Sequence, residues 1–236
     1  MGVAGRSASD AAFGGYSNLV VVYASASTVT VTCDWLVLDD GTNSRTVKTV
    51  SVTPAITTSG ENGLDSGSEA SSTWYSVWVI AKADGSSVSG LLSASTASPT
   101  MPTNYTLKRR VGWVRNDASS NFMTFYQAGP HSYGAARNIV ASGTATTFTT
   151  VDVSSSVPPT TSEIYFGTYG INMSGSPELW VRTKSDQSGD GVVLRMNAAV
   201  GGLEFTAITG VASQAFQYKV TSSTWDLTVL AYIDNL

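Results

Sequence analysis

One run of eight residues, 74–81, constrains the fold of this chain more than any other part of it. It reads Trp-Tyr-Ser-Val-Trp-Val-Ile-Ala. In a β-strand, successive side chains point to opposite faces. Here one face would carry Trp74, Ser76, Trp78 and Ile80, and the other would carry Tyr75, Val77 and Val79. Because both faces are apolar, the strand is expected to be covered on both sides, as in the centre of a sandwich or at an oligomer interface.

The rest of the chain repeats this preference for strands. Alternation is clearest in 215–221, where Phe216, Tyr218 and Val220 alternate with Gln217, Lys219 and Thr221. No stretch shows a useful helical stripe. Further strands are predicted at 19–23, 28–38, 46–52, 109–115, 122–127, 147–153, 163–169, 179–183, 191–197 and 226–233. The sequence therefore predicts an all-β protein built from β-sandwich or jelly-roll-like domains.

Composition changes along the chain predict two such domains. Residues 1–18 are mostly small and are expected to form a short, flexible, extended arm. A first sandwich is predicted over 19–128 and a second over 146–236. Between them, 129–145 begins with Gly129-Pro130 and is expected to be a linker. The local motifs of the first half do not recur in the second, so we predict two similar architectures without a sequence repeat.

A series of short motifs lies within 62–117. They are Gly63-Leu64-Asp65, Trp74-Tyr75, Gly90-Leu91-Leu92-Ser93, Pro99, Pro102, Tyr105, Lys108-Arg109-Arg110, Gly112, Arg115 and Asp117. In this order they resemble a module of virion proteins from tailed bacteriophages and their prophages. The resemblance covers about a quarter of the chain closely. It implies a structural or attachment role as a fibre, spike or head decoration, and leaves head and tail locations open.

The resemblance also implies partners, and the composition agrees with them. Charged residues make up only 13% of the chain, and Ser, Thr, Gly and Ala replace them. Such a surface loses little side-chain entropy when it is covered. We therefore expect a homo-oligomer, implied to be a trimer, that contacts other virion proteins and host surface glycan. The net charge of −4 argues against a nucleic-acid partner.

Cysteine usage and hydropathy point to assembly inside a bacterial cell. Cys33 is the only cysteine and lies in 28–37, where Val29, Val31, Cys33, Trp35 and Val37 are predicted to share one face. A buried, inert thiol is expected there. No signal-peptide core and no apolar run of membrane-spanning length is present. The expected location is the virion, assembled in the host cytoplasm without membrane insertion.

Catalytic groups are sparse, so we expect no enzyme activity and no cofactor or metal. The single histidine, His131, falls in the predicted linker. The segment 186–191 resembles a calcium loop but lacks its ligand alternation, so a turn is favoured. Carboxylates that a glycosidase could use are Asp65, Glu69, Glu163, Glu178 and Glu204. A small glycan depolymerase therefore remains an alternative.

Tryptophan side chains suggest the other alternative, a carbohydrate-binding β-sandwich module. Most of the 6 tryptophans fall inside strand patterns, which favours core packing. Trp180 and Trp225 lie beside polar or Gly-Ser-Pro segments and are the candidates for exposed sugar platforms. Tyr105, Arg109 and Arg110 are the other candidates for contact with a neighbouring subunit or a glycan.

Overall fold

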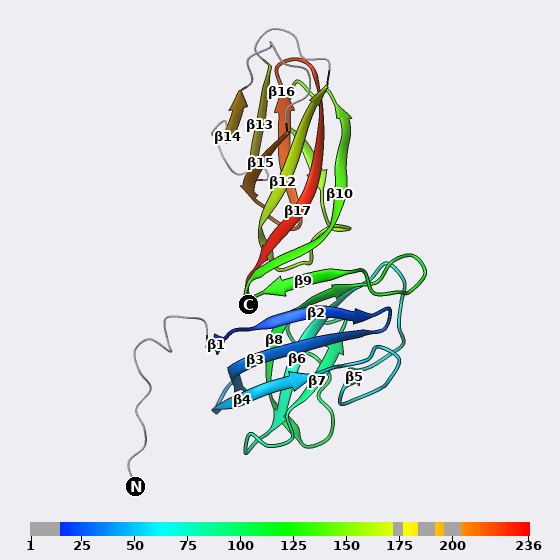
Figure 1. Cartoon of the computed structure of the whole chain (residues 1–236), viewed down its shortest axis with the longest axis vertical. Helices are drawn as coiled ribbons and strands as arrows, with labels where there is room; N and C mark the ends of the chain where they lie inside the picture. The colour runs from blue at the N-terminus through cyan, green and yellow to red at the C-terminus, as the bar shows by residue number, and fades with distance from the viewer. Residues whose placement is uncertain (1–14, 172–176, 184–191, 196–203) are drawn as a thin grey trace, which may run out of the picture. The chain divides into compact units, whose positions relative to one another are not determined.

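The computed structural model describes residues 15–171, 177–183, 192–195 and 204–236, and within them the protein is all-β without a helix (Figure 1). The chain divides into two compact units at Pro130 and His131, with Leu236 counted in the first. Of the predicted arm, 1–14 lie outside the described residues. Its end belongs to the first unit, because Tyr16 and Ser17 pair with Leu36 and Trp35.

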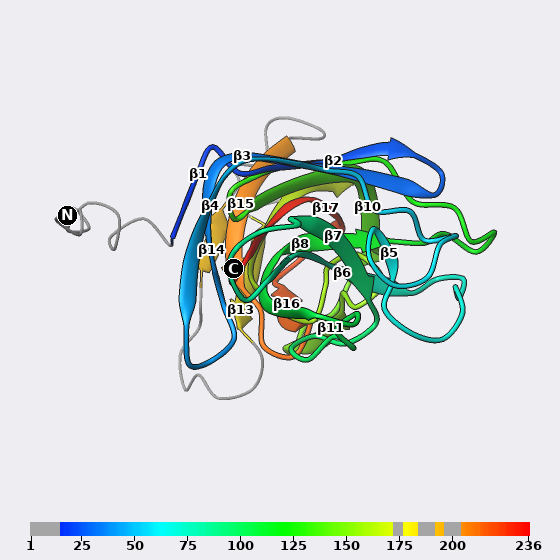
Figure 2. The same ribbon diagram turned by 90° about the horizontal axis from the view of Figure 1, so that it is seen from below.

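The first unit is formed by mostly antiparallel strands in two connected groups. Its strands are β1 (Tyr16–Ser17), β2 (Val20–Ser25), β3 (Thr28–Asp39), β4 (Ser44–Val52), β5 (Gly63–Leu64), β6 (Trp74–Lys82), β7 (Ser89–Ser93), β8 (Tyr105–Arg115) and β9 (Phe125–Ala128). In one group β3 pairs with β1, β2 and β4, and β2 pairs with β9. In the other, β6 lies between β7 and β8, and β5 runs parallel to β7. Figures 1 and 2 both show β2 and β3 running side by side.

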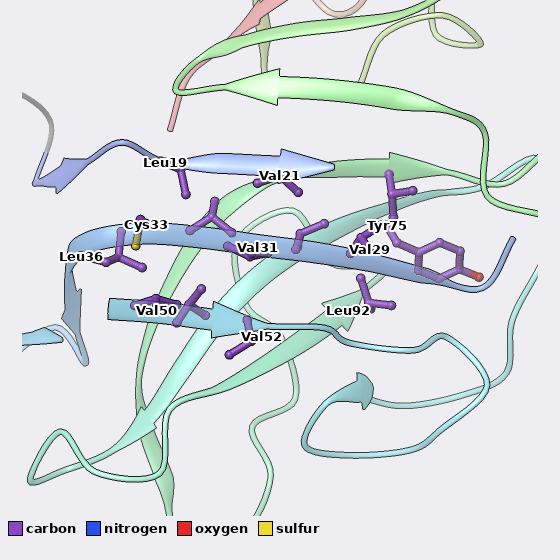
Figure 3. Close-up of a cluster of buried hydrophobic side chains, with 14 of the residues drawn as sticks. Leu19, Val21, Val29, Val31, Cys33, Leu36, Val50, Val52, Tyr75 and Leu92 are labelled. Carbon is purple, nitrogen blue, oxygen red and sulfur yellow. The ribbon is translucent and has the colours of Figure 1, made fainter. Parts of the chain in front are cut away.

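The core of this unit fills the space between the two groups (Figure 3). Val21, Val29 and Val31 face Tyr75 and Leu92 across it. All five side chains are almost fully buried. Burying one large aliphatic or aromatic side chain stabilises the folded state by about 1.5–3 kcal/mol. This cluster is therefore the main source of stability in the unit.

The predicted two-sided burial of β6 is confirmed, since each residue from Tyr75 to Ala81 is buried. One face contributes Tyr75, Val77 and Val79 to the main core. On the other face, Trp78 and Ile80 form a second cluster. Leu91, Tyr105 and Met101 complete this cluster. Met101 comes from the segment between Pro99 and Pro102, so this segment covers the outer face of β6 and is part of the packing.

The predicted common face of Val29, Val31, Cys33, Trp35 and Val37 is only half right. Beyond Cys33 the buried residues are Leu36 and Leu38, while Trp35 and Val37 are partly exposed. On the paired strand β4, Thr49 has a φ of 52°. A positive φ breaks the strand alternation, and β4 also changes phase there, because Val47 and Val50 are both buried.

The second unit is a sandwich of two four-stranded sheets. Its strands are β10 (His131–Gly143), β11 (Thr149–Asp152), β12 (Thr161–Ile171), β13 (Glu178–Thr183), β14 (Val192–Arg195), β15 (Glu204–Gly210), β16 (Ala215–Val220) and β17 (Thr224–Asp234). One sheet has the order β15-β12-β17-β10 and the other β11-β16-β13-β14. Their inner faces meet where the rings of Phe166 and Phe216 stack with centroids 6.0 Å apart. The alternation predicted for 215–221 is confirmed in β16.

The predicted linker 129–145 is wrong over most of its length, because His131–Gly143 is the strand β10. Most of its side chains are exposed, and its pairing with β17 is interrupted by three register shifts. Because β10 has no buried face, its sequence shows no alternation of apolar residues. The strand is held in place by backbone pairing with β17. His131 is therefore the first residue of a strand, opposite Ile233.

Candidate functional site

The polar residues of the segment 62–117, which carries the motifs, make hydrogen bonds within the first unit. One oxygen of Asp65 (Oδ2) accepts hydrogen bonds from the Ser93 hydroxyl at 2.7 Å and the Thr100 backbone N–H at 2.8 Å. The Asp65 N–H donates to the Leu92 carbonyl at 2.8 Å. Asn62 is bound twice to Gly90, through its own N–H at 2.8 Å and through its side-chain oxygen at 2.9 Å. These bonds tie the proline-containing loop and β5 to β7.

The motif glycines lie where two parts of the backbone or core approach closely. A Cβ at Gly63 would lie 2.4 Å from the Thr58 carbonyl oxygen. At Gly90 it would lie 2.6 Å from the Pro54 ring. At Gly112 it would lie 2.3 Å from the side-chain oxygen of Gln127. At each position a side chain would collide with its neighbours. Close packing therefore explains why these three residues are glycines.

The end of the motif is a hydrogen-bonded turn. The buried Asn116 donates to the Glu69 carboxylate at 2.8 Å and to the Ala70 carbonyl at 3.0 Å. Asp117 accepts from the backbone N–H groups of Ser119 and Asn121 at 2.7 and 2.9 Å. Those bonds, first from Asn121 and then from Ser119, lower the pKa of Asp117. Glu69, one of the candidate acids, therefore serves a structural bond.

Three predicted contact residues lie on β8, and one of them is inaccessible. Tyr105 is 7% exposed and its hydroxyl lies 3.1 Å from that of Ser89. Burial, followed by the Glu61 carboxylate, raises the pKa of this phenol. The Arg109 guanidinium lies 5.5 Å from the ring centroid of Tyr16. Arg110 lies 5.4 Å from that of Trp113, so both cations rest on aromatic rings of the first unit.

Trp180 and Trp225, the two tryptophans predicted to be exposed, differ in burial. Trp225 is fully buried, at 0% exposure, and is a core residue of the second unit. The sequence suggested exposure because polar residues precede it, but Trp225 lies on the inner side of β17 together with the buried Leu227 and Val229. Trp180 lies half-buried in β13 on the opposite side from the buried Leu179 and Val181. Of these two, Trp180 is the one available as a surface platform.

Trp180 is part of an aromatic and cationic surface that we call the Trp180 face, comprising Phe148, Trp180, Arg182, Gln217 and Lys219. The Lys219 ammonium lies 4.5 Å from the ring centroid of Trp180 and 4.6 Å from that of Phe148. The Arg182 guanidinium lies 3.7 Å from the Phe148 centroid and donates to Gln217 at 2.8 Å. Cation–π contacts of this kind fix the rings in place. The sequence predicted Trp180 as a site residue but not Phe148, which lies within the predicted strand 147–153 and directly precedes β11.

The remaining candidate groups are scattered. The Glu178 carboxylate accepts from the Trp180 indole N–H at 3.0 Å, and Glu163 is exposed on β12. The side chain of Glu204 and the whole of 186–191 lie outside the described residues. The His131 ring lies 6.4 Å from that of Tyr165. Within the described ranges, no three His, Cys, Asp or Glu side chains gather as metal ligands would.

Cys33 is a buried residue of β3 (Figure 3). Burial, followed by the nearby Asp34 carboxylate, raises the pKa of Cys33 to about 11. Because a raised pKa reduces the reactive thiolate, alkylation by iodoacetamide at about pH 8 should be at least ~100-fold slower than in urea-unfolded protein. A mass-spectrometric time course with and without urea measures this. Similar rates in both states would contradict the buried position of Cys33.

Comparison with known proteins gave no match among family models, curated sequences or solved structures. In the part of the chain that the structure describes, no helix has the length and hydropathy of a membrane span.

Proposed function

We propose that this chain is a non-enzymatic structural protein of a tailed-phage virion, an oligomeric fibre, spike or decoration subunit for assembly and host attachment. One observation carries the proposal: the motifs that resemble virion proteins serve as a packing framework. Asp65 joins three segments through hydrogen bonds, and Gly63 and Gly90 permit close contacts. A motif whose residues have such roles suits a protein whose task is to be rigid.

The surface of the chain adds support. Only 13% of the residues are charged, which keeps the entropic cost of covering the surface low. The second unit carries the Trp180 face, which has the aromatic and polar groups of a recognition surface. Assembly and adhesion by such a protein involve no bond making.

Localisation on intact particles tests the proposal. We expect antibody against the chain to label phage particles purified from a host that carries its coding sequence, as seen by negative-stain electron microscopy. Label over the head would identify a decoration or head-fibre protein, and label at the tail a fibre or receptor-binding component. Particles from a host in which the coding sequence is deleted serve as the control. Purified particles without the chain, by label and by mass spectrometry, would contradict the proposal.

The Trp180 face favours one second candidate, a carbohydrate-binding module. Sugar sites combine an aromatic platform with a few fixed polar groups. Trp180 and Phe148 offer the platform, and Gln217, itself bonded to Thr150 at 3.2 Å, offers a fixed amide. This function would operate with or without a virion.

A further inference from the structure

The segment 94–104, which joins β7 to β8, covers the outer face of β6 without belonging to a strand. Hydrogen bonds hold it to the rest of the first unit at two points. The Ser76 hydroxyl donates to the Ser95 carbonyl at 2.7 Å, and the Thr100 N–H donates to the Asp65 carboxylate at 2.8 Å. The two prolines of the segment have no N–H to donate. Its attachment to β6 therefore depends on side-chain packing more than on backbone pairing.

Met101 is the side chain through which this segment packs against the buried cluster of Trp78, Ile80, Leu91 and Tyr105. Met101 itself is only partly buried, so solvent reaches the residue. A thioether fills irregular apolar gaps well, but peroxides convert it to a polar sulfoxide. The position therefore combines access for a small oxidant with an apolar contact that the oxidised side chain would disturb.

The polar groups of this cluster are already engaged in hydrogen bonds. The indole N–H of Trp78 donates to the Ser76 hydroxyl at 2.7 Å. The hydroxyls of Tyr105 and Ser89 lie 3.1 Å apart. A sulfoxide oxygen on Met101 would have to break one of these bonds or stay in the cluster without a donor, and both are unfavourable. The oxidised side chain is therefore expected to leave the cluster and to take the segment with it.

Met123, another methionine of the first unit, has different surroundings. It is also partly buried, but its sulfur lies 3.9 Å from a terminal guanidinium nitrogen of Arg115. A sulfoxide oxygen accepts hydrogen bonds more strongly than a thioether, and a guanidinium is a charged donor. Oxidation of Met123 would therefore give the new oxygen a partner. Two methionines of similar burial are expected to respond to the same oxidant in opposite ways.

We propose that Met101 is a peroxide-sensitive modification site, at which oxidation releases the segment 94–104 from the outer face of β6. The Met101 sulfur attacks one oxygen of hydrogen peroxide, the O–O bond breaks and an S–O bond forms. The proton on the transferred oxygen passes to the other oxygen, which leaves as water. The sulfur is oxidised by two electrons and the peroxide is reduced by two. This inference does not depend on the proposed function, because it concerns the packing of the first unit alone.

The test treats the folded full chain with hydrogen peroxide and compares amide hydrogen exchange before and after treatment. Peptide mapping by mass spectrometry reports the sulfoxide at each methionine. After oxidation, the hydrogen-bonded amides of Thr100 and Tyr105 should exchange at least about tenfold faster. Met101→Leu is the matched control, because it conserves apolar volume and retains the other four of the 5 methionines. Peroxide should leave exchange in Met101→Leu unchanged, whereas Met123→Leu should respond as the wild type does.

Three results would overturn the inference. Peroxide that oxidises Met123 and leaves Met101 intact would show that Met101 is protected in the folded chain. A complete Met101 sulfoxide with unchanged exchange over 94–105 would show that the cluster accepts the oxidised side chain. Equal acceleration in Met101→Leu would assign the effect to another methionine. Circular dichroism and exchange before treatment verify that both variants fold as the wild type does.

Discussion

Gly90→Ala is expected to lower the free energy of unfolding by about 2–3 kcal/mol, the range of an overpacked core position. A Cβ at this position would lie 2.6, 2.8 and 3.0 Å from three carbons of the Pro54 ring. That ring is stiff and buried, so it cannot rotate away as a long side chain would. The backbone of β7 would have to move, and the two hydrogen bonds between Gly90 and Asn62 would be strained with it.

The measurement is urea unfolding followed by circular dichroism, with two comparison variants. Gly167→Ala is the control, because a Cβ on this strand glycine meets Leu230 at an ordinary 3.4 Å. It should change stability by about 1 kcal/mol or less. Pro54→Ala combined with Gly90→Ala should recover part of the loss, since it removes the colliding atoms. Equal stability of Gly90→Ala and the wild type would show that this motif glycine has another purpose, and would weaken the framework interpretation of the motif.

In the first unit, the strand with the clearest apolar pattern was predicted correctly. The run 74–81 was predicted to be covered on both sides, and every residue from Tyr75 to Ala81 is buried. The signal was strong because both faces are apolar over the whole length of the strand. The covering elements were harder to predict. Strand β7 was not among the predicted strands, because its five residues include Ser89, Gly90 and Ser93, which give little strand signal.

Two other differences between prediction and structure have causes that cannot be recognised in a sequence pattern. The burial pattern of β3 changes phase beside Thr49 of β4, and the residue type threonine does not predict a positive φ. Strand β10 is held by backbone pairing with β17 and exposes most of its side chains. Its composition therefore resembles a linker.

The candidate site was predicted in part. Trp180 was chosen correctly as a partly exposed tryptophan, while Trp225 and Tyr105 are buried. Phe148, Arg182 and Lys219 join Trp180 only through the pairing of β11, β13 and β16. The Trp180 face has no local motif, because it is assembled across strands.

The contrast between the two tryptophans gives the largest expected effect. Trp225→Ala should destabilise the second unit by about 3–5 kcal/mol, because it removes a fully buried indole and leaves a cavity. Trp180→Ala should cost about 1 kcal/mol or less, since it removes a half-buried ring and its cation–π contact with Lys219. Urea unfolding of both variants measures the difference. Comparable losses would mean that Trp180 is also a core residue and that the Trp180 face is no binding surface.

The stable variant then separates the two candidate functions. Because Trp180→Ala should remain folded, any loss of ligand binding can be assigned to the missing platform and not to unfolding. Binding of the wild type on a glycan array, lost in Trp180→Ala and kept in Tyr126→Lys at an exposed site of the first unit, would support a carbohydrate-binding surface. A wild type that binds no glycan would contradict that second candidate, and the virion proposal would then rest on assembly.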